Sequence, residues 1–357
     1  MSLKKIAKEA YIKGKLLTWY QSNARILPWR KKIDKKLPNP YHIFVSEFML
    51  QQTKVNSVIP KFNEFIKIWP TIQKLSRIKE SSILRFWSGL GYYARARHLL
   101  TSTKIIAKKY NYIIPKQYSY LIELPGIGDY TAKAIQSIAY NEPVMPIDSN
   151  IKRIISRIQG ITKPIKETEF RIARLAQKLI SIKNSSNFVQ ALMDYGSIVC
   201  LPNAPKCNKC IIQSHCVAFK KKLTNKIPIK KIHSNLKTIK FTRAYMIINE
   251  CNEFFVRRRL EKGMLQSMIE VPNDKWVKNK KNLVTDNFIK SCSLKLFKLK
   301  EKMIYSFSHF DLDVEVYYVK VKKTKFKKIQ WFSLNKINDS GLPTVMKKIV
   351  KIYMNSI

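Results

Sequence analysis

The chain has 357 residues, of which 45% are hydrophobic and 11% aromatic, and its 68 Lys and Arg against 23 Asp and Glu give a formal net charge of +45. This length predicts two domains, the apolar content is ample for globular cores, and the lack of any run of about 18 apolar residues excludes a membrane span. So large a positive surplus predicts binding to a polyanion through release of phosphate counterions, although a bias toward Lys, Ile and Asn along the whole chain supplies part of it.

The first 216 residues carry apolar side chains at three- and four-residue spacing, which predicts a mainly helical domain. Residues 1–20 read as an amphipathic helix without the apolar core and cleavage site of a signal peptide. Further helical runs are expected at 43–58, 82–87, 94–107, 130–140, 151–158 and 170–182.

Glu47 is the first candidate for chemistry, because it lies in a largely apolar helical run. A carboxyl group held against apolar surface resists ionisation, so its proton is available near neutral pH for general acid catalysis. A solvent-facing glutamate on an amphipathic helix is the alternative.

A glycine-containing turn, Leu124-Pro-Gly-Ile-Gly128, lies between two predicted helices. Gly126 and Gly128 allow a tight turn that exposes backbone N–H groups at the start of the next helix, where a phosphate oxygen is favoured without any base being read. The turn therefore predicts a DNA backbone contact, and it gains weight from Asp148 and the cysteines that follow it. Asp148 can cap the next helix, remain ionised opposite a developing positive charge, or do both.

Four cysteines, Cys200, Cys207, Cys210 and Cys216, follow the spacing C-x6-C-x2-C-x5-C. Thiolates in this number suit an iron–sulfur cluster or a structural zinc in a reducing compartment. Zinc sites with four cysteines usually contain two CxxC pairs, whereas this chain has one, but spacing alone leaves zinc open.

The chain changes character after the cysteines. No Asp or Glu occurs from Leu201 through Asn249, and residues 220–240 hold eight lysines, which predicts a basic linker. Alternating apolar residues then predict strands near 243–248, 254–259 and 312–318, followed by a helix at 342–353. The expected organisation is a helical domain at 1–219, the linker, and a smaller α+β domain at 241–357.

Several segments of the first two thirds of the chain together resemble one family. They are Leu27-Pro-Trp-Arg30, Ser46-Glu-Phe-Met-Leu-Gln-Gln-Thr53, Gly89-Leu-Gly-Tyr-Tyr-Ala-Arg-Ala-Arg97, the glycine turn, Ile147-Asp-Ser-Asn-Ile-Lys-Arg153 and the cysteine loop. This set resembles the helix-hairpin-helix DNA glycosylases of the endonuclease III superfamily, and within it the MutY family, which removes adenine mispaired with 8-oxoguanine. The last third resembles, more weakly, the Nudix-like domain with which that family reads 8-oxoguanine.

The resemblance implies roles for individual residues. Glu47 would protonate the flipped adenine, Asp148 would stabilise the oxocarbenium-like sugar, and Asn150 and Tyr130 would support them. The cysteines would hold a [4Fe-4S] cluster. The adenine pocket would be lined by Arg25, Leu27, Trp29, Leu50, Val55 and Gln190; Gln52 and Tyr92 would wedge into the duplex; Phe307, Ser308 and His309 would touch the lesion. Trp29 and Tyr92 are equally compatible with core aromatic residues.

Tyr130 separates two branches of the superfamily. Relatives that also cut the DNA strand carry a lysine at this position, and a phenol cannot form the Schiff base that they use. Base removal without efficient strand cleavage is therefore expected. The acidic Nudix box is absent and Glu270 alone cannot replace it, so the second domain is predicted to bind without hydrolysing. Its segment 263–272 departs from the family pattern.

The expected protein is a monomeric adenine DNA glycosylase of a bacterial-type cytoplasm, associated with the nucleoid, that acts on double-stranded DNA with A:8-oxoG or A:G mispairs and has no membrane partner. Three alternatives remain: an endonuclease III-like pyrimidine glycosylase with lyase activity, an inactive iron–sulfur protein that senses damage, and a nucleotide pyrophosphatase. Tyr130 argues against the lyase, because it cannot form a Schiff base. The presence of both Glu47 and Asp148 argues against an inactive protein, and the missing acidic box argues against a pyrophosphatase.

Overall fold

The computed structural model describes residues 3–30, 32–33, 37–229, 237–261, 263–266, 268–322, 330–339 and 341–356. It forms two compact units, the first made of Met1–Ile78 and His98–His233 and the second of Lys79–Arg97 and Ser234–Ile357. The inclusion of Lys79–Arg97 in the second unit was not predicted. The predicted linker at 220–240 runs from the end of the last helix of the first unit to the first strand of the second, and its residues 230–236 lie outside the described part.

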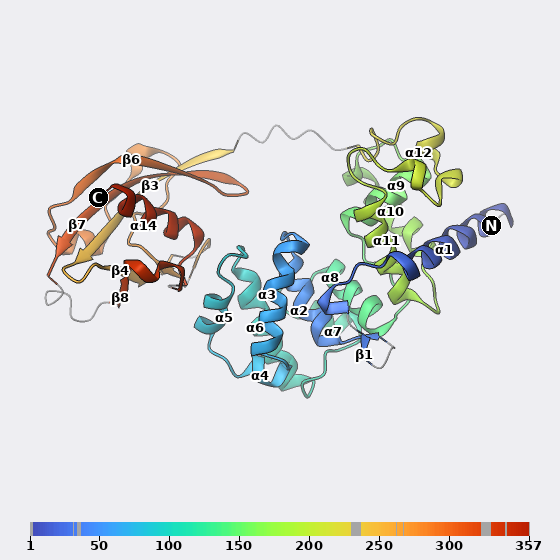
Figure 1. The fold of residues 1–357 in the computed structure, drawn as a ribbon, viewed down its shortest axis with the longest axis horizontal. Helices are drawn as coiled ribbons and strands as arrows, with labels where there is room; N and C mark the ends of the chain where they lie inside the picture. The colour runs from blue at the N-terminus through green and yellow to red at the C-terminus, as the bar shows by residue number, and fades with distance from the viewer. Residues whose placement is uncertain are drawn as a thin grey trace. The chain divides into compact units, whose positions relative to one another are not determined.

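The first unit is helical, as predicted (Figure 1). Its helices are α1 (Leu3–Asn23), α2 (Pro40–Leu50), α3 (Val55–Ile68), α4 (Ile72–Ser76), most of α6 (Ala94–Lys109), α7 (Tyr118–Ile122), α8 (Asp129–Ala134), α9 (Ser149–Gln159), α10 (Ile165–Lys178), α11 (Ser185–Ile198) and α12 (Val217–Lys220). A 3-10 turn, η1 (Pro28–Arg30), precedes α2, two short strands, β1 (Lys32–Ile33) and β2 (Leu37–Pro38), pair between them, and a π-helical turn, η2 (Ile135–Ala139), continues α8.

The run at 43–58 was predicted as one helix but forms two. The first, α2, begins with Pro40 after the capping side chain of Asn39, a favourable start for a helix, and its buried face includes Glu47. It ends at Leu50 because Gln52 takes a left-handed conformation with φ of +57°. The break creates a turn at residues 51–54, and this turn positions polar side chains beside the candidate site.

The glycine turn connects α7 to α8, where the sequence predicts it. Gly126 has φ of +81°, and a Cβ atom there would lie 2.6 Å from His98 Cβ and 2.8 Å from Phe48 Cε1. Gly128 begins α8 with an ordinary φ of −97°, and a Cβ there would meet no atom within 4 Å. Gly126 is therefore required by packing and backbone conformation, whereas Gly128 leaves open space at the start of the helix.

The second unit contains a mixed sheet of six strands in the order β5-β4-β3-β7-β6, with β8 paired to β4. The strands are β3 (Thr238–Asn249), β4 (Glu253–Arg258), β5 (Ile269–Glu270), β6 (Phe297–Ser306), β7 (Phe310–Val321) and β8 (Gln330–Ser333). The pair β3–β7 is parallel, in register from Thr238↔Phe310 to Asn249↔Val321, and the other pairs are antiparallel. The strand predicted at 312–318 is present, and Leu312, Val314 and Val316 are buried, but Glu315 is buried as well, so the predicted alternation is incomplete.

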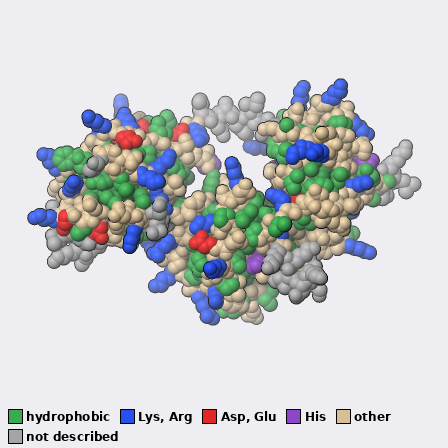
Figure 2. Space-filling model, in the orientation of Figure 1, with side chains coloured by type: hydrophobic (Ala, Val, Ile, Leu, Met, Phe, Trp, Pro, Cys, Tyr) green, Lys and Arg blue, Asp and Glu red, His purple; other side chains and the backbone are tan. Residues whose placement is uncertain are grey.

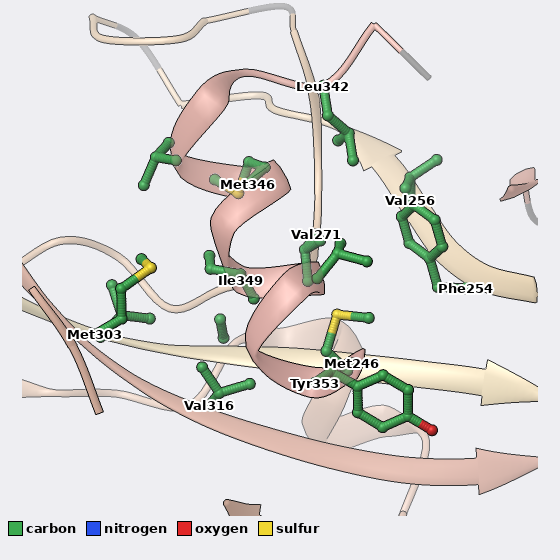
Figure 3. Close-up of a cluster of buried hydrophobic side chains, with 14 of the residues drawn as sticks. Met246, Phe254, Val256, Val271, Met303, Val316, Leu342, Met346, Ile349 and Tyr353 are labelled. Carbon is green, nitrogen blue, oxygen red and sulfur yellow. The ribbon is translucent and has the colours of Figure 1, made fainter. Parts of the chain in front are cut away.

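The sheet of the second unit is covered by helices on its two faces. Helix α14 (Thr344–Ser356) packs its side chains Met346, Ile349 and Tyr353 toward Met246 and Val316 of the strands (Figure 3). A smaller cluster on the other face includes Ile289 of α13 (Asn287–Ser291). Helix α5 (Glu80–Phe86) also belongs to this unit. The predicted α+β class is confirmed.

Basic side chains are scattered over the face shown in Figure 2, with few acidic ones among them. None of the helices in the described part of the chain has the length and apolar character that crossing a membrane requires.

Candidate active site

A cavity of about 450 Å³ opens in the first unit. Ten residues that the sequence singled out line it together: Arg25, Leu27, Trp29, Glu47, Leu50, Gln52, Val55, Tyr130, Asp148 and Asn150. Nine further residues complete its lining: Arg30, Ile43, Gln51, Thr53, Ile138, Ile147, Ser149, Met193 and Ser197. Most of the second group lie next to a predicted site residue in the chain, whereas Ile138, Met193 and Ser197 come from segments that proximity in sequence could not have revealed.

Glu47 is the acidic residue that α2 carries into this cavity, and it is 6% exposed. Burial is the largest influence on its carboxyl group and, with the nearby negative charge of Asp148, raises its pKa to about 7. The Arg30 guanidinium and a hydrogen bond from Tyr130 act in the opposite direction. Glu47 can therefore hold a proton near neutral pH and release it there.

Asp148 caps α9, as one of its two predicted interpretations requires. Its Oδ1 accepts from the backbone N–H of Ile151 at 2.7 Å, and its Oδ2 accepts from Asn150 Nδ2 at 2.8 Å. Burial is the largest influence and raises the pKa of Asp148 overall, although these hydrogen bonds and the Arg153 guanidinium favour its ionised form. Arg153 also donates to Asn150 Oδ1 at 2.8 Å, so a chain of donors orients the carboxylate. The capping role leaves Asp148 on the cavity wall, so both predicted roles are compatible.

Tyr130 occupies the position that separates the two branches of the superfamily. Its side chain is half-buried, lines the cavity and hydrogen-bonds to Glu47. Burial, followed by the charges of Glu47 and Asp148, raises its pKa well above the usual value, so the phenol remains a hydrogen-bond donor. The cations among the described lining residues are Arg25 and Arg30, and no lysine is among them.

For Trp29 and Gln190, the sequence could not decide between a place in the cavity wall and a place in the core. Trp29 is 3% exposed, packs edge-on against Phe62 at 5.4 Å and also lines the cavity, so it is both a core residue and a wall residue. Gln190, predicted to line the same pocket, lies on α11 outside the lining and donates through Nε2 to Ser186 O at 3.0 Å.

The glycine turn is tied to the cavity rim. Gln51 Nε2, in the turn after α2, donates to the carbonyl of Gly126 at 3.2 Å. Neither Gly126 nor Gly128 lines the cavity itself. The turn is therefore connected to the cavity lining through Gln51.

The segment Phe307-Ser308-His309 forms the turn between β6 and β7, in the second unit. Phe307 is half-buried and packs on Trp276 and Tyr305, with ring centroids 5.5 and 4.8 Å away, while Ser308 and His309 are exposed. Tyr92, which belongs to the same unit and has a left-handed backbone with φ of +47°, places its hydroxyl against that of Ser308. The structure thus brings together a predicted wedge residue and a predicted lesion contact that are 216 residues apart in the sequence.

Glu270, the remaining acidic candidate of the second unit, is 3% exposed. Its Oε1 accepts from Arg257 Nε at 3.0 Å, and its Oε2 accepts from Arg259 Nη1 at 2.7 Å. Both carboxylate oxygens are therefore engaged by arginines, and Glu270 has the position of a buried structural anion.

The four cysteines of the predicted cluster line one small cavity of about 30 Å³ in the first unit. Donors surround their sulfurs: Arg157 Nη1 lies 3.3 Å from Cys200 Sγ, and the hydroxyls of Tyr195 and Thr224 bond to Cys210 and Cys207. Within the described residues, no group of three or more His, Cys, Asp or Glu is placed to hold a single metal ion. Four cysteine thiols that line one cavity, with hydrogen-bond donors beside them, are a donor set that could hold either an iron–sulfur cluster or a zinc ion.

Comparison with known proteins places these two units in known families. Residues 45–199 match the HhH-GPD superfamily of base excision DNA repair proteins, and residues 243–351 match the NUDIX domain. The structure resembles that of a thermostable thymine-DNA glycosylase, with a TM-score of 0.55 and 25% identity over 61% of this chain and 99% of that one. It also shares the fold of endonuclease III in a non-covalent DNA complex, with a TM-score of 0.52 and 18% identity over 62% of this chain and 99% of that one. The fold is that of a base-excision DNA glycosylase.

Relatives that match over nearly the whole chain show which kind of DNA glycosylase it resembles. The adenine DNA glycosylase of Buchnera aphidicola subsp. Schizaphis graminum is 35% identical over 95% of this chain and 97% of its own length. The adenine DNA glycosylase of Arabidopsis thaliana is 38% identical over 57% of this chain and 36% of its own. The chain belongs to the adenine DNA glycosylase family.

Proposed function

We propose that the protein hydrolyses the N-glycosidic bond of adenine mispaired with 8-oxoguanine or guanine and leaves the DNA strand intact. The observation that carries this proposal is the cavity in which Glu47, with a pKa raised to about 7, lies with Asp148 and Tyr130. Two carboxyl groups in different environments, one able to stay protonated and one held by hydrogen-bond donors, are what glycosidic cleavage requires.

In the proposed reaction Glu47 donates its proton to a ring nitrogen of the flipped adenine. The electron pair of the bond between the base and C1′ leaves with the base, and the sugar gains positive charge that faces Asp148. Water then adds to C1′ and loses a proton, which restores Glu47. Asn150 and the backbone of Ile151 keep the Asp148 carboxylate oriented during these steps.

Extrusion of adenine from the duplex requires a pocket and a plug. The cavity volume, about 450 Å³, lies in the range of about 300–1,000 Å³ typical of ligand sites, and Leu27, Trp29 and Val55 supply apolar walls for a purine. We assign Gln52 and Tyr92 to the wedge, and Gly126 and Gly128 to a phosphate of the DNA backbone. Arg25, Leu50 and Gln190 complete the proposed base contacts.

Tyr130 supports base removal without strand cleavage. A Schiff base with the sugar needs an amine, and the described lining offers two arginines, which stay charged, and no lysine. Phe307, Ser308 and His309 would read the oxidised guanine on the opposite strand. Glu270 is held by Arg257 and Arg259, which supports a second domain that binds its target without hydrolysing it.

Cys200, Cys207, Cys210 and Cys216 would hold a [4Fe-4S] cluster. The cluster would supply rigidity to the loop 200–216, so that Lys206 and Lys209 face phosphates. The partner of the protein is then double-stranded DNA, bound by a monomer, and a nucleoid-associated location in a bacterial-type cytoplasm follows from that substrate.

Single-turnover cleavage tests the proposal, on duplexes with A opposite 8-oxoguanine, A opposite guanine and A opposite T, each assayed before and after alkali. Strand breaks seen only after alkali, and only for the mispaired adenines, are expected. Breaks before alkali would overturn the assignment of Tyr130, and no base loss from any duplex despite tight binding would overturn the enzyme assignment.

A further inference from the structure

The segment from Arg25 to Arg30 forms a thin wall between two cavities. Arg25, Leu27 and Arg30 line both the 450 Å³ candidate site and a second cavity of about 650 Å³ on the side of α1. Leu27 and Trp29 are buried and anchor the wall by packing, whereas Ile26 between Arg25 and Leu27 is 98% exposed and adds no such support. Packing of the apolar residues leaves open what orients the two arginine side chains of the wall.

Asp194 of α11 orients both arginine side chains. Its carboxylate is fully buried, and three donors of the wall bind it: Arg25 Nε at 2.6 Å, the backbone N–H of Arg25 at 2.9 Å and Arg30 Nη1 at 2.8 Å. A buried carboxylate is tolerated only when it is paired and hydrogen-bonded, so Asp194 and the two arginines stabilise one another in one arrangement. The sequence could not have predicted that Asp194 pairs with these arginines, because 164 or more residues separate the partners.

We propose that Asp194 is a positioning residue for adenine excision, which holds Arg25 and Arg30 in the cavity wall and thereby keeps the Arg30 guanidinium facing Glu47. The inference rests on the proposed function, because it assigns Asp194 to the same reaction. Asp194 itself does not line the cavity and acts through the arginines.

The contact of Asp194 with Arg30 is linked to Glu47 through electrostatics. The charged and titratable groups facing Glu47 are Asp148, which raises its pKa, and Arg30 and Tyr130, which lower it. Without Asp194, Arg30 would lose its carboxylate partner and keep its hydrogen bond with the Tyr20 hydroxyl, which lines the second cavity. Arg30 would then turn away from Glu47, and the pKa of Glu47 would rise.

The test is the pH dependence of single-turnover adenine excision for the full-length protein, its Asp194→Asn and Arg30→Gln variants, and the double variant. Glu47 acts in its protonated form, so activity falls as the pH rises through its pKa. Both single variants should therefore move the alkaline limb to higher pH, and both should slow excision about 10- to 100-fold because the wall loses its position. The double variant should show no further shift, since both changes remove the same contact.

Glu64→Gln is the matched control, because it removes a carboxylate from an exposed ion pair with Lys61 on α3. It should leave rate and profile unchanged. An Asp194→Asn profile that stays in place or moves to lower pH, or effects that add in the double variant, would overturn the positioning role. If Asp194→Asn does not yield folded protein, an unshifted profile for Arg30→Gln overturns it. If the wild-type protein excises no adenine, the proposed function itself is wrong, and the inference about Asp194 is then wrong as well.

Discussion

At the scale of residues, the proposed general acid of the candidate site is one buried carboxyl group whose neighbours shift its pKa in opposite directions. Burial and Asp148 favour the protonated form of Glu47, whereas Arg30 and Tyr130 favour the ionised form. The balance places the pKa at about 7, where a group can both donate and regain a proton. This placement has a price in stability, because an ionised carboxyl is unfavourable in the same cavity.

Glu47→Gln should therefore abolish most activity and stabilise the protein. Excision should fall about 10²- to 10⁴-fold, the usual contribution of a general acid. In the wild type, stability is lost as the pH rises from the unfolded-state pKa of 4.5 through the folded-state value of about 7, and the glutamine variant avoids this loss. The gain in unfolding free energy should be near zero below pH 4.5 and reach at most about 3 kcal/mol above pH 7. Denaturant unfolding at pH 5 and pH 8 measures it, and an equal difference at both pH values would contradict the assigned pKa.

Tyr130→Phe isolates one of the opposing contacts. The variant loses the hydrogen bond that favours ionised Glu47, so the pKa of Glu47 should rise and the alkaline limb of excision should move to higher pH. Tyr118→Phe is a fair control, because it removes an exposed tyrosine–carboxylate hydrogen bond to Asp129. A limb that moves equally in both variants, or only in the control, would show that Tyr130 does not tune Glu47.

At the scale of elements, short irregular turns place the site, while the helices supply its frame. The turn after α2 lines the cavity with Gln51 and Gln52, and the turn before α8 receives a hydrogen bond from Gln51. The two glycines of the latter turn have different requirements. Gly126 has a left-handed backbone and no room for a methyl group, whereas Gly128 has neither restriction.

Gly126→Ala and Gly128→Ala should therefore fail in different ways. The first should lower the unfolding free energy by about 2–5 kcal/mol, from backbone strain and from overlap with His98 and Phe48. The second should stay within about 1 kcal/mol of the wild type, yet bind duplex DNA more weakly, because its methyl group would stand where a phosphate approaches. Thermal unfolding and DNA titration separate the two effects. Equal stabilities would disprove the packing argument, and unchanged DNA affinity for Gly128→Ala would disprove the phosphate contact.

At the scale of the whole molecule, the proposed function places catalysis and lesion reading in separate compact units. Each unit has its own core, and the second is organised around α14 and the mixed sheet (Figure 3). Ser308 belongs to the second unit, on a turn that Phe307 anchors and with its hydroxyl against that of Tyr92, whereas Glu47 belongs to the first unit. A change at the turn should therefore alter the choice of substrate and leave the chemical step intact.

Ser308→Ala tests this division. It should lower the preference for A opposite 8-oxoguanine over A opposite guanine several-fold, because one hydrogen bond of about 1 kcal/mol is lost only with the oxidised base. Single-turnover excision from the guanine mispair should stay unchanged. Loss of both activities in parallel would place Ser308 in catalysis or folding, and an unchanged preference would remove it from lesion reading.

The sequence by itself determined the class of each unit, the helical and strand periodicities, and the local motifs. Asp148 capping α9 and the tight turn at Gly126 depend on residues adjacent in the chain, so propensity and spacing suffice to predict them. Ten predicted site residues also line one cavity, but the motifs located them through resemblance to a family, and spacing alone would not have done so.

Only the tertiary structure decided the contacts between distant segments. The run at 43–58 breaks where Gln52 takes a left-handed backbone conformation. A polar residue within a helical pattern does not predict such a conformation. The pairing of Asp194 with Arg25 and Arg30, and the exclusion of Gln190 from the cavity lining, follow from how α11 packs against the wall segment. The burial and the electrostatic environment of a site residue depend on its distances to all of its neighbours. Folding sets these distances, so the sequence alone does not give them.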